Sequence, residues 1–209
     1  MGARWALTMS EPLHSADQRI DALLRTASAL ERGHFVLQSG HHSDQRVAVN
    51  ALLQLGTAVE EIGQTLATKS RALVSEMGSD IDLVVGATPG EFVLAEQVGD
   101  IFGVRSAVAD DRLGAMIPAR ARVLILASDS EAADSIELLL PSLYTAGAHP
   151  IVAAVAVSRT PERTAIEVVG RDSIPLIAGI TLNLPTYEPA NCPLCAAGEP
   201  IGAPGSSGR

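Results

Sequence analysis

Apolar positions recur at helical spacing in two long stretches of the chain. The first stretch contains Ile20, Leu23, Leu24, Ala27 and Leu30. Ser15 and Asp17 precede these residues as plausible caps, so we expect an amphipathic helix over residues 15–32 that ends at Gly33. The second stretch predicts a helix over residues 56–77.

Three short apolar runs have the character of buried strands. They cover residues 81–85, 122–126 and 151–157. Helical patterns over residues 91–102 and 135–146 separate them. Strands that alternate with helices predict an α/β fold, with a mainly parallel twisted sheet flanked by helices. Ligands bind such sheets at the carboxyl ends of the strands, so the loops after Val85 and Leu126 are the expected site.

Two further segments flank this alternating core. Residues 34–37 and 46–50 have the composition of short strands around the polar turn 38–44, and the chain beyond Ile180 is rich in proline and glycine. The expected organisation is an extension, a main α/β domain with a small hood-like region at its N-terminal end, and a loop-rich tail. These parts cover residues 1–14, 15–180 with the hood over 15–55, and 181–209.

Composition narrows the classes of function. A chain of 209 residues with 47% hydrophobic content can bury one substantial core. Its net charge of −9 argues against nucleic acid, which requires clustered Lys and Arg. The longest purely apolar run is far shorter than a membrane helix, and the first residues lack the apolar centre of a signal peptide. We therefore expect a cytoplasmic protein with no membrane or nucleic-acid partner.

Four sequence motifs stand out against this background. Residues 33–44 read G-H-F-V-L-Q-S-G-H-H-S-D, and residues 86–90 read G-A-T-P-G. The third motif covers residues 123–135, and the fourth runs from L-P-T-Y at 184–187 to C-P-L-C at 192–195. Together they resemble the type I phosphoribosyltransferases, and within that family the orotate phosphoribosyltransferases.

The resemblance implies a fold and a set of ligand contacts. The first motif would line the nucleobase side, the second the pyrophosphate, and the third the ribose and its 5-phosphate. It implies orotate and phosphoribosyl pyrophosphate (PRPP) as substrates, Mg²⁺ as a cofactor only if PRPP is used, and a homodimer. The implied ligand-binding residues are Phe35, Ser39, Gly40, His41, Ser43, Thr88, Gly90, Glu91, Ser128, Ser130, Ser135 and Arg105.

The third motif departs from the family where phosphate should bind. The acidic pair that holds the ribose becomes Ala127 and Ser128, and the stretch T-T-G-G becomes residues 131–134, which include Glu131 and Asp134. Two like charges about 4 Å apart repel by about 4 kcal/mol at an effective dielectric near 20, roughly a thousandfold in affinity. The pyrophosphate loop also continues into Glu91, and the shortened catalytic loop, residues 105–114, contains no lysine.

The acids in this loop have two interpretations. In one, S-D-S-E over residues 128–131 is a capping box for the following helix. In the other, Asp129, Glu131 and Asp134 face a cation, an amine or a metal, or act as acid or base.

Histidines and arginines carry similar alternatives. His41 and His42 are interpreted as an exposed turn, or as ligands beside the nucleobase site. Four arginines are interpreted as surface charges paired with Asp110 and Asp111, and two of them, Arg105 and Arg112, are also candidates for an anionic ligand. The four are Arg105, Arg112, Arg120 and Arg122.

Cys192 and Cys195 form a single C-x-x-C pair. Zinc takes four ligands, so the pair offers half a site that a dimer or nearby histidines would have to complete. A small structural turn with free thiols and a redox or disulfide role are the alternatives, and no metal is assigned from the sequence.

The sequence therefore predicts a diverged orotate phosphoribosyltransferase-like protein without ordinary PRPP-dependent transfer. It would be a non-catalytic subunit, in a homodimer or in a heteromer with a related enzyme, or a protein repurposed for another nucleobase or nucleotide-like molecule. The alternative is an active orotate phosphoribosyltransferase of pyrimidine biosynthesis, in which arginines or another subunit supply the missing contacts.

Overall fold

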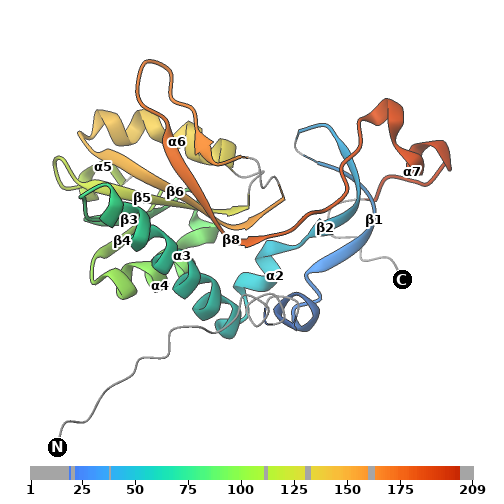
Figure 1. Ribbon diagram of the computed structural model, residues 1–209, viewed down its shortest axis with the longest axis horizontal. Helices are drawn as coiled ribbons and strands as arrows, with labels where there is room; N and C mark the ends of the chain where they lie inside the picture. Colours follow the sequence, from blue (N-terminus) through green and yellow to red (C-terminus); the bar gives the residue numbers. More distant parts are fainter. Residues whose placement is uncertain are drawn as a thin grey trace, which may run out of the picture.

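A six-stranded sheet forms the centre of the molecule (Figure 1). The computed structural model describes residues 19, 22–37, 39–110, 113–129, 133–159 and 163–202. In sheet order the strands are β4 (Arg105–Val108), β3 (Leu83–Gly86), β5 (Arg122–Asp129), β6 (His149–Ser158), β8 (Ile174–Thr181) and β7 (Ala165–Ile166). Neighbouring strands run parallel from β4 to β8, and only β7 pairs antiparallel. The expected parallel α/β architecture is confirmed.

Helices cover both faces of this sheet, as Figure 1 shows. Because side chains alternate along a strand, Val123 and Ile125 of β5 face α6 (Ala133–Thr145), whereas Leu124 and Leu126 face the opposite side. There they pack against α3 (Gly56–Glu76) and α4 (Phe92–Phe102). Burial on both faces explains why the central strands are continuously apolar in sequence.

The helices lie close to where the sequence places them. α3 matches the helix expected over residues 56–77, and α4 follows a short 3-10 turn, η1 (Pro89–Glu91). Gly103 ends α4 with φ 72°, a left-handed conformation in which a side chain would be strained. A further short helix, α5 (Leu113–Met116), follows β4.

The segment before α3 differs from the expectation. The chain is helical at residues 22–26, but Ser28 has φ 49° and the chain enters β1 (Leu30–Val36) well before Gly33. β1 pairs antiparallel with β2 (His42–Val47), and this pairing prevails over the helical pattern of residues 15–32. The strand expected over 46–50 is also wrong beyond Val47, because α2 (Val49–Leu53) buries its apolar side chains in the core.

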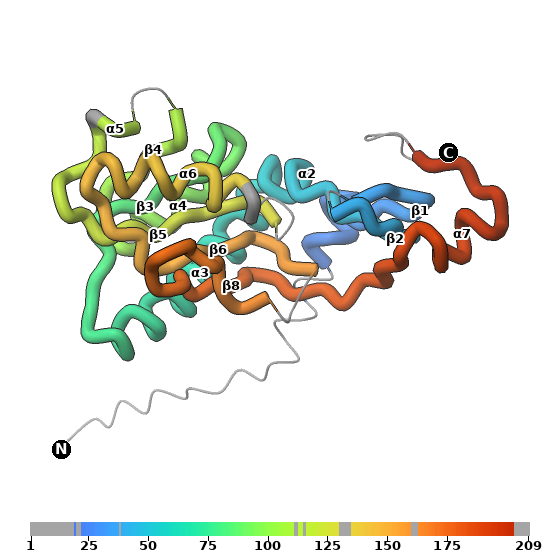
Figure 2. The backbone as a smooth tube through the Cα atoms, turned by 90° about the horizontal axis from the view of Figure 1, so that it is seen from above, coloured from blue at the N-terminus to red at the C-terminus, as the bar shows by residue number. Residues whose placement is uncertain are grey.

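The tail lies against the β1–β2 hairpin, at the end of the molecule away from α5 and α6 (Figures 1 and 2). His42 and Tyr187 exchange two backbone hydrogen bonds of 2.8 Å each. Beyond them the tail contains η2 (Pro189–Asn191) and α7 (Pro193–Ala196). The sequence did not reveal β7 or β8, which precede these tail elements in the chain.

At Gly179, α3 packs closely against the sheet. A methyl group placed on its Cα would lie 2.8 Å from the carbonyl oxygen of Ala156, 3.1 Å from Ile62 and 3.4 Å from Leu66. The backbone oxygen on β6 cannot move aside without disturbing the sheet. Only glycine therefore permits this spacing between helix and strand.

We expect Gly179→Ala to lower the free energy of unfolding by about 1–3 kcal/mol, the usual cost of overpacking a core. Gly56→Ala is the matched control, because a methyl group on Gly56 would meet nothing within 4 Å. Urea denaturation of both variants measures the difference. Equal stability of the two would contradict the assigned close contact.

Candidate functional site

The carboxyl ends of the parallel strands border an open cavity of about 890 Å³. Ala87 and Thr88 follow β3, Ala109 and Asp110 follow β4, and Ser135 lies in the first turn of α6. The cavity continues along α6 between that helix and α5. The loop after Val85, at which the sequence predicted a site, thus borders this cavity. Asp110 is the only charged residue in the described lining, so the described wall presents no positive charge to a phosphate.

Glu91 turns back onto its own loop. Its carboxylate accepts a 2.7 Å hydrogen bond from the Thr88 backbone N–H and a second bond from the Thr88 hydroxyl, while Thr88 Oγ1 accepts from Gly90 N at 3.3 Å. This arrangement is a capping box, and Glu91 is only 4% exposed. The Thr88 N–H, the Thr88 hydroxyl and the Gly90 N–H are therefore all hydrogen-bonded within this segment.

The end of β5 carries two of the positions at which the resemblance implied ribose contacts. Ala127 is fully buried in the core, and Ser128 and Asp129 are half-buried residues of the strand. The capping box expected at Ser128 for the following helix is wrong, because β5 continues to Asp129 and α6 begins at Ala133. Pairing of Asp129 with Val157 keeps this stretch extended.

Some of the predicted residues cannot be placed. Ser130, Glu131 and the side chain of Asp134 lie outside the described residues, as does Arg112. Ser135 is half-buried and lines the cavity. Convergence of Asp129 with Glu131 and Asp134 stays a prediction.

The chain's single lysine and several arginines are used elsewhere. Lys69 on α3 donates to the carbonyl oxygens of Ala178, at 2.6 Å, and Gly179, and its partial desolvation lowers its pKa. Arg105 is exposed at the amino end of β4, opposite Leu83, so it points to the wrong end of the sheet for the cavity.

Arg122 does not pair with Asp110 as expected. It binds Asp82 through hydrogen bonds of 2.7 and 2.8 Å, and these lower the pKa of Asp82 to about 2. Because this pair lies at the amino edge of the sheet, it joins β5 to the segment before β3 and has no part in the cavity.

The hairpin holds the predicted nucleobase residues in two different settings. Phe35 is 2% exposed, and the Arg46 guanidinium covers one face of its ring at 4.6 Å, so the described structure gives Phe35 a packing role. Ser39, Gly40 and His41 form the turn, where Gly40 has φ 81°. His42, expected in the same exposed turn, instead lies in β2 and is 7% exposed.

Ser43 contacts Arg159, a residue that the sequence did not single out. Arg159, directly after β6, is 9% exposed and donates a 2.9 Å hydrogen bond to Ser43 Oγ. The Ser43 hydroxyl in turn donates to the Pro185 carbonyl oxygen at 2.6 Å. One serine thus links the hairpin, the tail and the carboxyl edge of the sheet. The position of Arg159 at a strand end was the available signal, since ligands bind at that edge.

Cys192, between η2 and α7, and Cys195, on α7, lie beside the hairpin and do not line the cavity. Their sulfur atoms gather with nitrogen atoms of His34 and His42. The two further ligands that the C-x-x-C pair would need for zinc are therefore present in the same chain, as His34 and His42.

No protein-family model matches the chain. The orotate phosphoribosyltransferase of Caldanaerobacter subterraneus subsp. tengcongensis is 26% identical over 196 residues, which cover 90% of this chain and 97% of that protein. That of Heliobacterium modesticaldum is 28% identical over 199 residues, covering 92% and 98%. The crystal structure of orotate phosphoribosyltransferase from Aeropyrum pernix matches with a TM-score of 0.62 at 20% identity, over 77% of this chain and 92% of that one.

The parallel sheet, its covering helices and these structural neighbours define the type I phosphoribosyltransferase fold. Within that fold the chain is an orotate phosphoribosyltransferase-like protein. No helix in the described part of the chain has the length and apolar content needed to cross a bilayer.

We expect Glu91→Ala to destabilise the protein by about 1–2 kcal/mol, because it removes both hydrogen bonds that close the loop. Glu96→Ala, on the exposed side of α4, should change stability by less than about 0.5 kcal/mol. Thermal and urea unfolding compare the two. Unchanged stability of the Glu91 variant would mean that this carboxylate does not serve as a cap.

Proposed function

We propose that this protein is a cytoplasmic, diverged member of the orotate phosphoribosyltransferase-like group that no longer performs ordinary PRPP-dependent transfer. It acts as a non-catalytic partner subunit, in a homodimer or with a related enzyme, or as a repurposed binder of a nucleobase or nucleotide-like molecule. The observation that carries this proposal is the state of the phosphate side, where Glu91 occupies its own loop.

Charge supports the proposal at each phosphate contact. PRPP is a polyanion, and its binding relies on backbone N–H groups, cations and Mg²⁺ held by carboxylates. Here the buried Ala127 carries no carboxylate, the Thr88 N–H already has an acceptor, and the described wall of the cavity contains only the acidic Asp110 as a charged group. Lys69 is bound to β8, on the other side of the sheet from α6.

The nucleobase side retains chemistry suited to an anion. The Arg159 guanidinium, which keeps its positive charge at any physiological pH, is nearly buried beside Ser43 and donates a hydrogen bond to its hydroxyl. Hydrogen bonds to an ion are strongest in such partly desolvated surroundings. A carboxylate-bearing pyrimidine such as orotate suits the surroundings of Arg159 better than PRPP suits the loop that Glu91 caps.

The alternative function is active orotate phosphoribosyl transfer. It is favoured by the similarity to named orotate phosphoribosyltransferases over nearly their whole length. It requires that cations outside the described cavity wall, or on a second subunit, replace the missing contacts and carry Mg²⁺ with PRPP.

Calorimetry with PRPP and Mg²⁺ separates these functions. We expect a dissociation constant weaker than about 1 mM, since the charge substitutions cost roughly a thousandfold relative to micromolar binding. An orotate-depletion assay on the same sample should show no turnover above background. Micromolar binding that Ser135→Asp abolishes, or clear formation of orotidine monophosphate, would establish the alternative.

Arg159→Gln tests the nucleobase side independently. If Arg159 binds an anionic pyrimidine, the substitution should weaken orotate binding by about 10–100-fold, the value of a charged hydrogen bond. Arg71→Gln is the control, because Arg71 lies on α3 and donates to the Ile101 carbonyl oxygen. Saturation-transfer NMR measures both variants. Equal orotate binding by wild type and Arg159→Gln would remove Arg159 from the site.

A further inference from the structure

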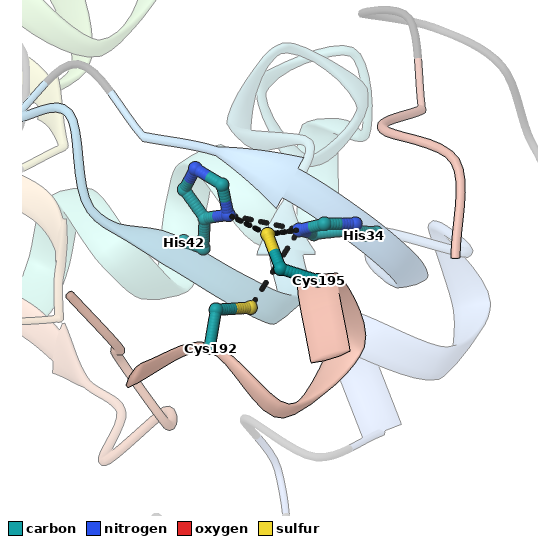
Figure 3. A group of neighbouring side chains, drawn as sticks. All are labelled: His34, His42, Cys192 and Cys195. Carbon is teal, nitrogen blue, oxygen red and sulfur yellow. Dashed lines mark hydrogen bonds between the residues drawn. The ribbon is translucent and has the colours of Figure 1, made fainter. Parts of the chain in front are cut away.

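Four side chains from distant parts of the sequence converge beside the hairpin (Figure 3). His34 comes from β1, His42 from β2, Cys192 from the end of η2, and Cys195 from α7. His34, His42 and Cys192 are 3%, 7% and 2% exposed, and Cys195 lies at the surface. The arrangement is a closed cluster of two imidazoles and two thiols.

The β1–β2 pairing has an irregularity that places His34 in this cluster. Arg32 pairs with Gln45 and Phe35 pairs with Ser43, so Gly33 and His34 together lie opposite one residue. An extra residue of this kind forms a β-bulge, which redirects the side chains at that point. As a result the His34 and His42 rings lie 4.9 Å apart, centroid to centroid.

The distances within the cluster resemble the edges of a zinc tetrahedron. Zn–S bonds of about 2.3 Å and Zn–N bonds of about 2.0 Å give edges of about 3.3 Å for N–N, 3.6 Å for N–S and 3.8 Å for S–S. His34 Nε2 lies 3.6 Å from each sulfur, and His42 Nδ1 lies 3.3 Å from Cys195 Sγ and 2.9 Å from His34 Nε2. All four ligand atoms lie within 4.8 Å of one another.

A second contact orients His34 for metal binding. Its Nδ1 lies 2.8 Å from the carbonyl oxygen of Glu199, which only accepts hydrogen bonds, so Nδ1 carries the proton. In the neutral ring the lone pair is then on Nε2, which faces the other three ligand atoms. Metal-bound histidines are oriented in this way by a carbonyl or carboxylate on their other nitrogen.

We propose that His34, His42, Cys192 and Cys195 bind one Zn²⁺ ion in a closed, structural site. Two thiolates and two imidazoles at tetrahedral spacing select zinc over the oxygen-preferring Mg²⁺ and Ca²⁺. Because all four positions are filled by protein, the ion has no open position for a substrate and serves stability.

The ion joins the tail to the hairpin. These segments otherwise share backbone bonds such as Gly202 N to His34 O, at 2.7 Å, and the hairpin is a two-stranded sheet separate from the main one. An isolated hairpin is marginally stable in water, so a metal that holds it to a second segment supplies what its small core lacks. Ser43 and the Arg159 contact lie on this same hairpin.

Cys192 and Cys195 bring two thiols together within this cluster. Two thiolates side by side repel, and a cation between them removes this repulsion. The competing outcome for the same two thiols is a Cys192–Cys195 disulfide.

Metal analysis of the full chain, purified under reducing conditions and dialysed against zinc and then buffer, tests the proposal. We expect one zinc per chain, and X-ray absorption should show two sulfur and two nitrogen ligands at about 2.3 and 2.0 Å. Cobalt substitution should give the visible bands of a tetrahedral thiolate complex. A strong chelator should lower the melting temperature, and added zinc should restore it.

Matched variants assign the ligands. His34→Ala should weaken zinc binding by at least about 100-fold, whereas His34→Cys retains a ligand and should retain the metal. His149→Gln is the control, because His149 is exposed at the start of β6.

Because the wild-type chelation experiment needs no variant, a misfolded mutant does not obscure the result. Wild-type protein that is metal-free after zinc dialysis, or that contains a Cys192–Cys195 disulfide, would overturn the proposal, and neither result bears on PRPP binding.

Discussion

Parallel pairing of β5 with β6, buried on both faces, is the constraint on which the rest of the structure depends. The backbone N–H and C=O groups of a buried strand such as Arg122–Asp129 need hydrogen bonds from a neighbouring strand on each side. Its side chains are buried only if helices cover both faces of the sheet. Every connection between parallel strands must then cross over the sheet, which returns each loop to the same carboxyl edge. The carboxyl edge that the cavity borders is a product of this geometry.

Function therefore depends on the loops, and the polar groups of the two sides of the candidate site differ in what they contact. At the loop after β3, Thr88 and Glu91 hydrogen-bond to one another, so the polar groups of this loop have partners without a ligand. On the other side, Ser43 and Arg159 join elements that are separate in the sequence and leave a guanidinium near the edge of the sheet. One fold can thus keep the architecture of a family while the polar groups at its site change partners.

The sequence was most informative where local pattern and tertiary structure agree. Continuous apolar runs located β5 and β6, because only strands buried on both faces have that pattern. It was misleading where strand pairing overrides local preference. The helical pattern before Gly33 yields to β1, and Ser128 and Asp129 belong to β5, which pairs with β6. The cap that forms is T-P-G-E at Thr88. β8 was missed because Pro175 and Gly179 interrupt its apolar pattern.

The contacts of the candidate site were harder to anticipate. The grouping of His34 and His42 with Cys192 and Cys195 depends on a bulge and on a tail that returns to the hairpin. The C-x-x-C spacing links the two cysteines, but nothing local to them indicates which histidines join them. Arg159 was accessible to reasoning from strand ends, but its partner Ser43 was not, since more than a hundred residues separate them.

The return of the tail to the hairpin also has a consequence for the order of folding. His34 and Glu199 are 165 residues apart, so their contact closes a loop that includes the entire central sheet. Each doubling of loop length adds only about 0.6 kcal/mol to the entropy of closure, but contacts of such high sequence separation form slowly. During synthesis, β1 and β2 are made before the strands of the central sheet and before the tail. They therefore gain their contacts with the tail only after the strands of the central sheet have been made.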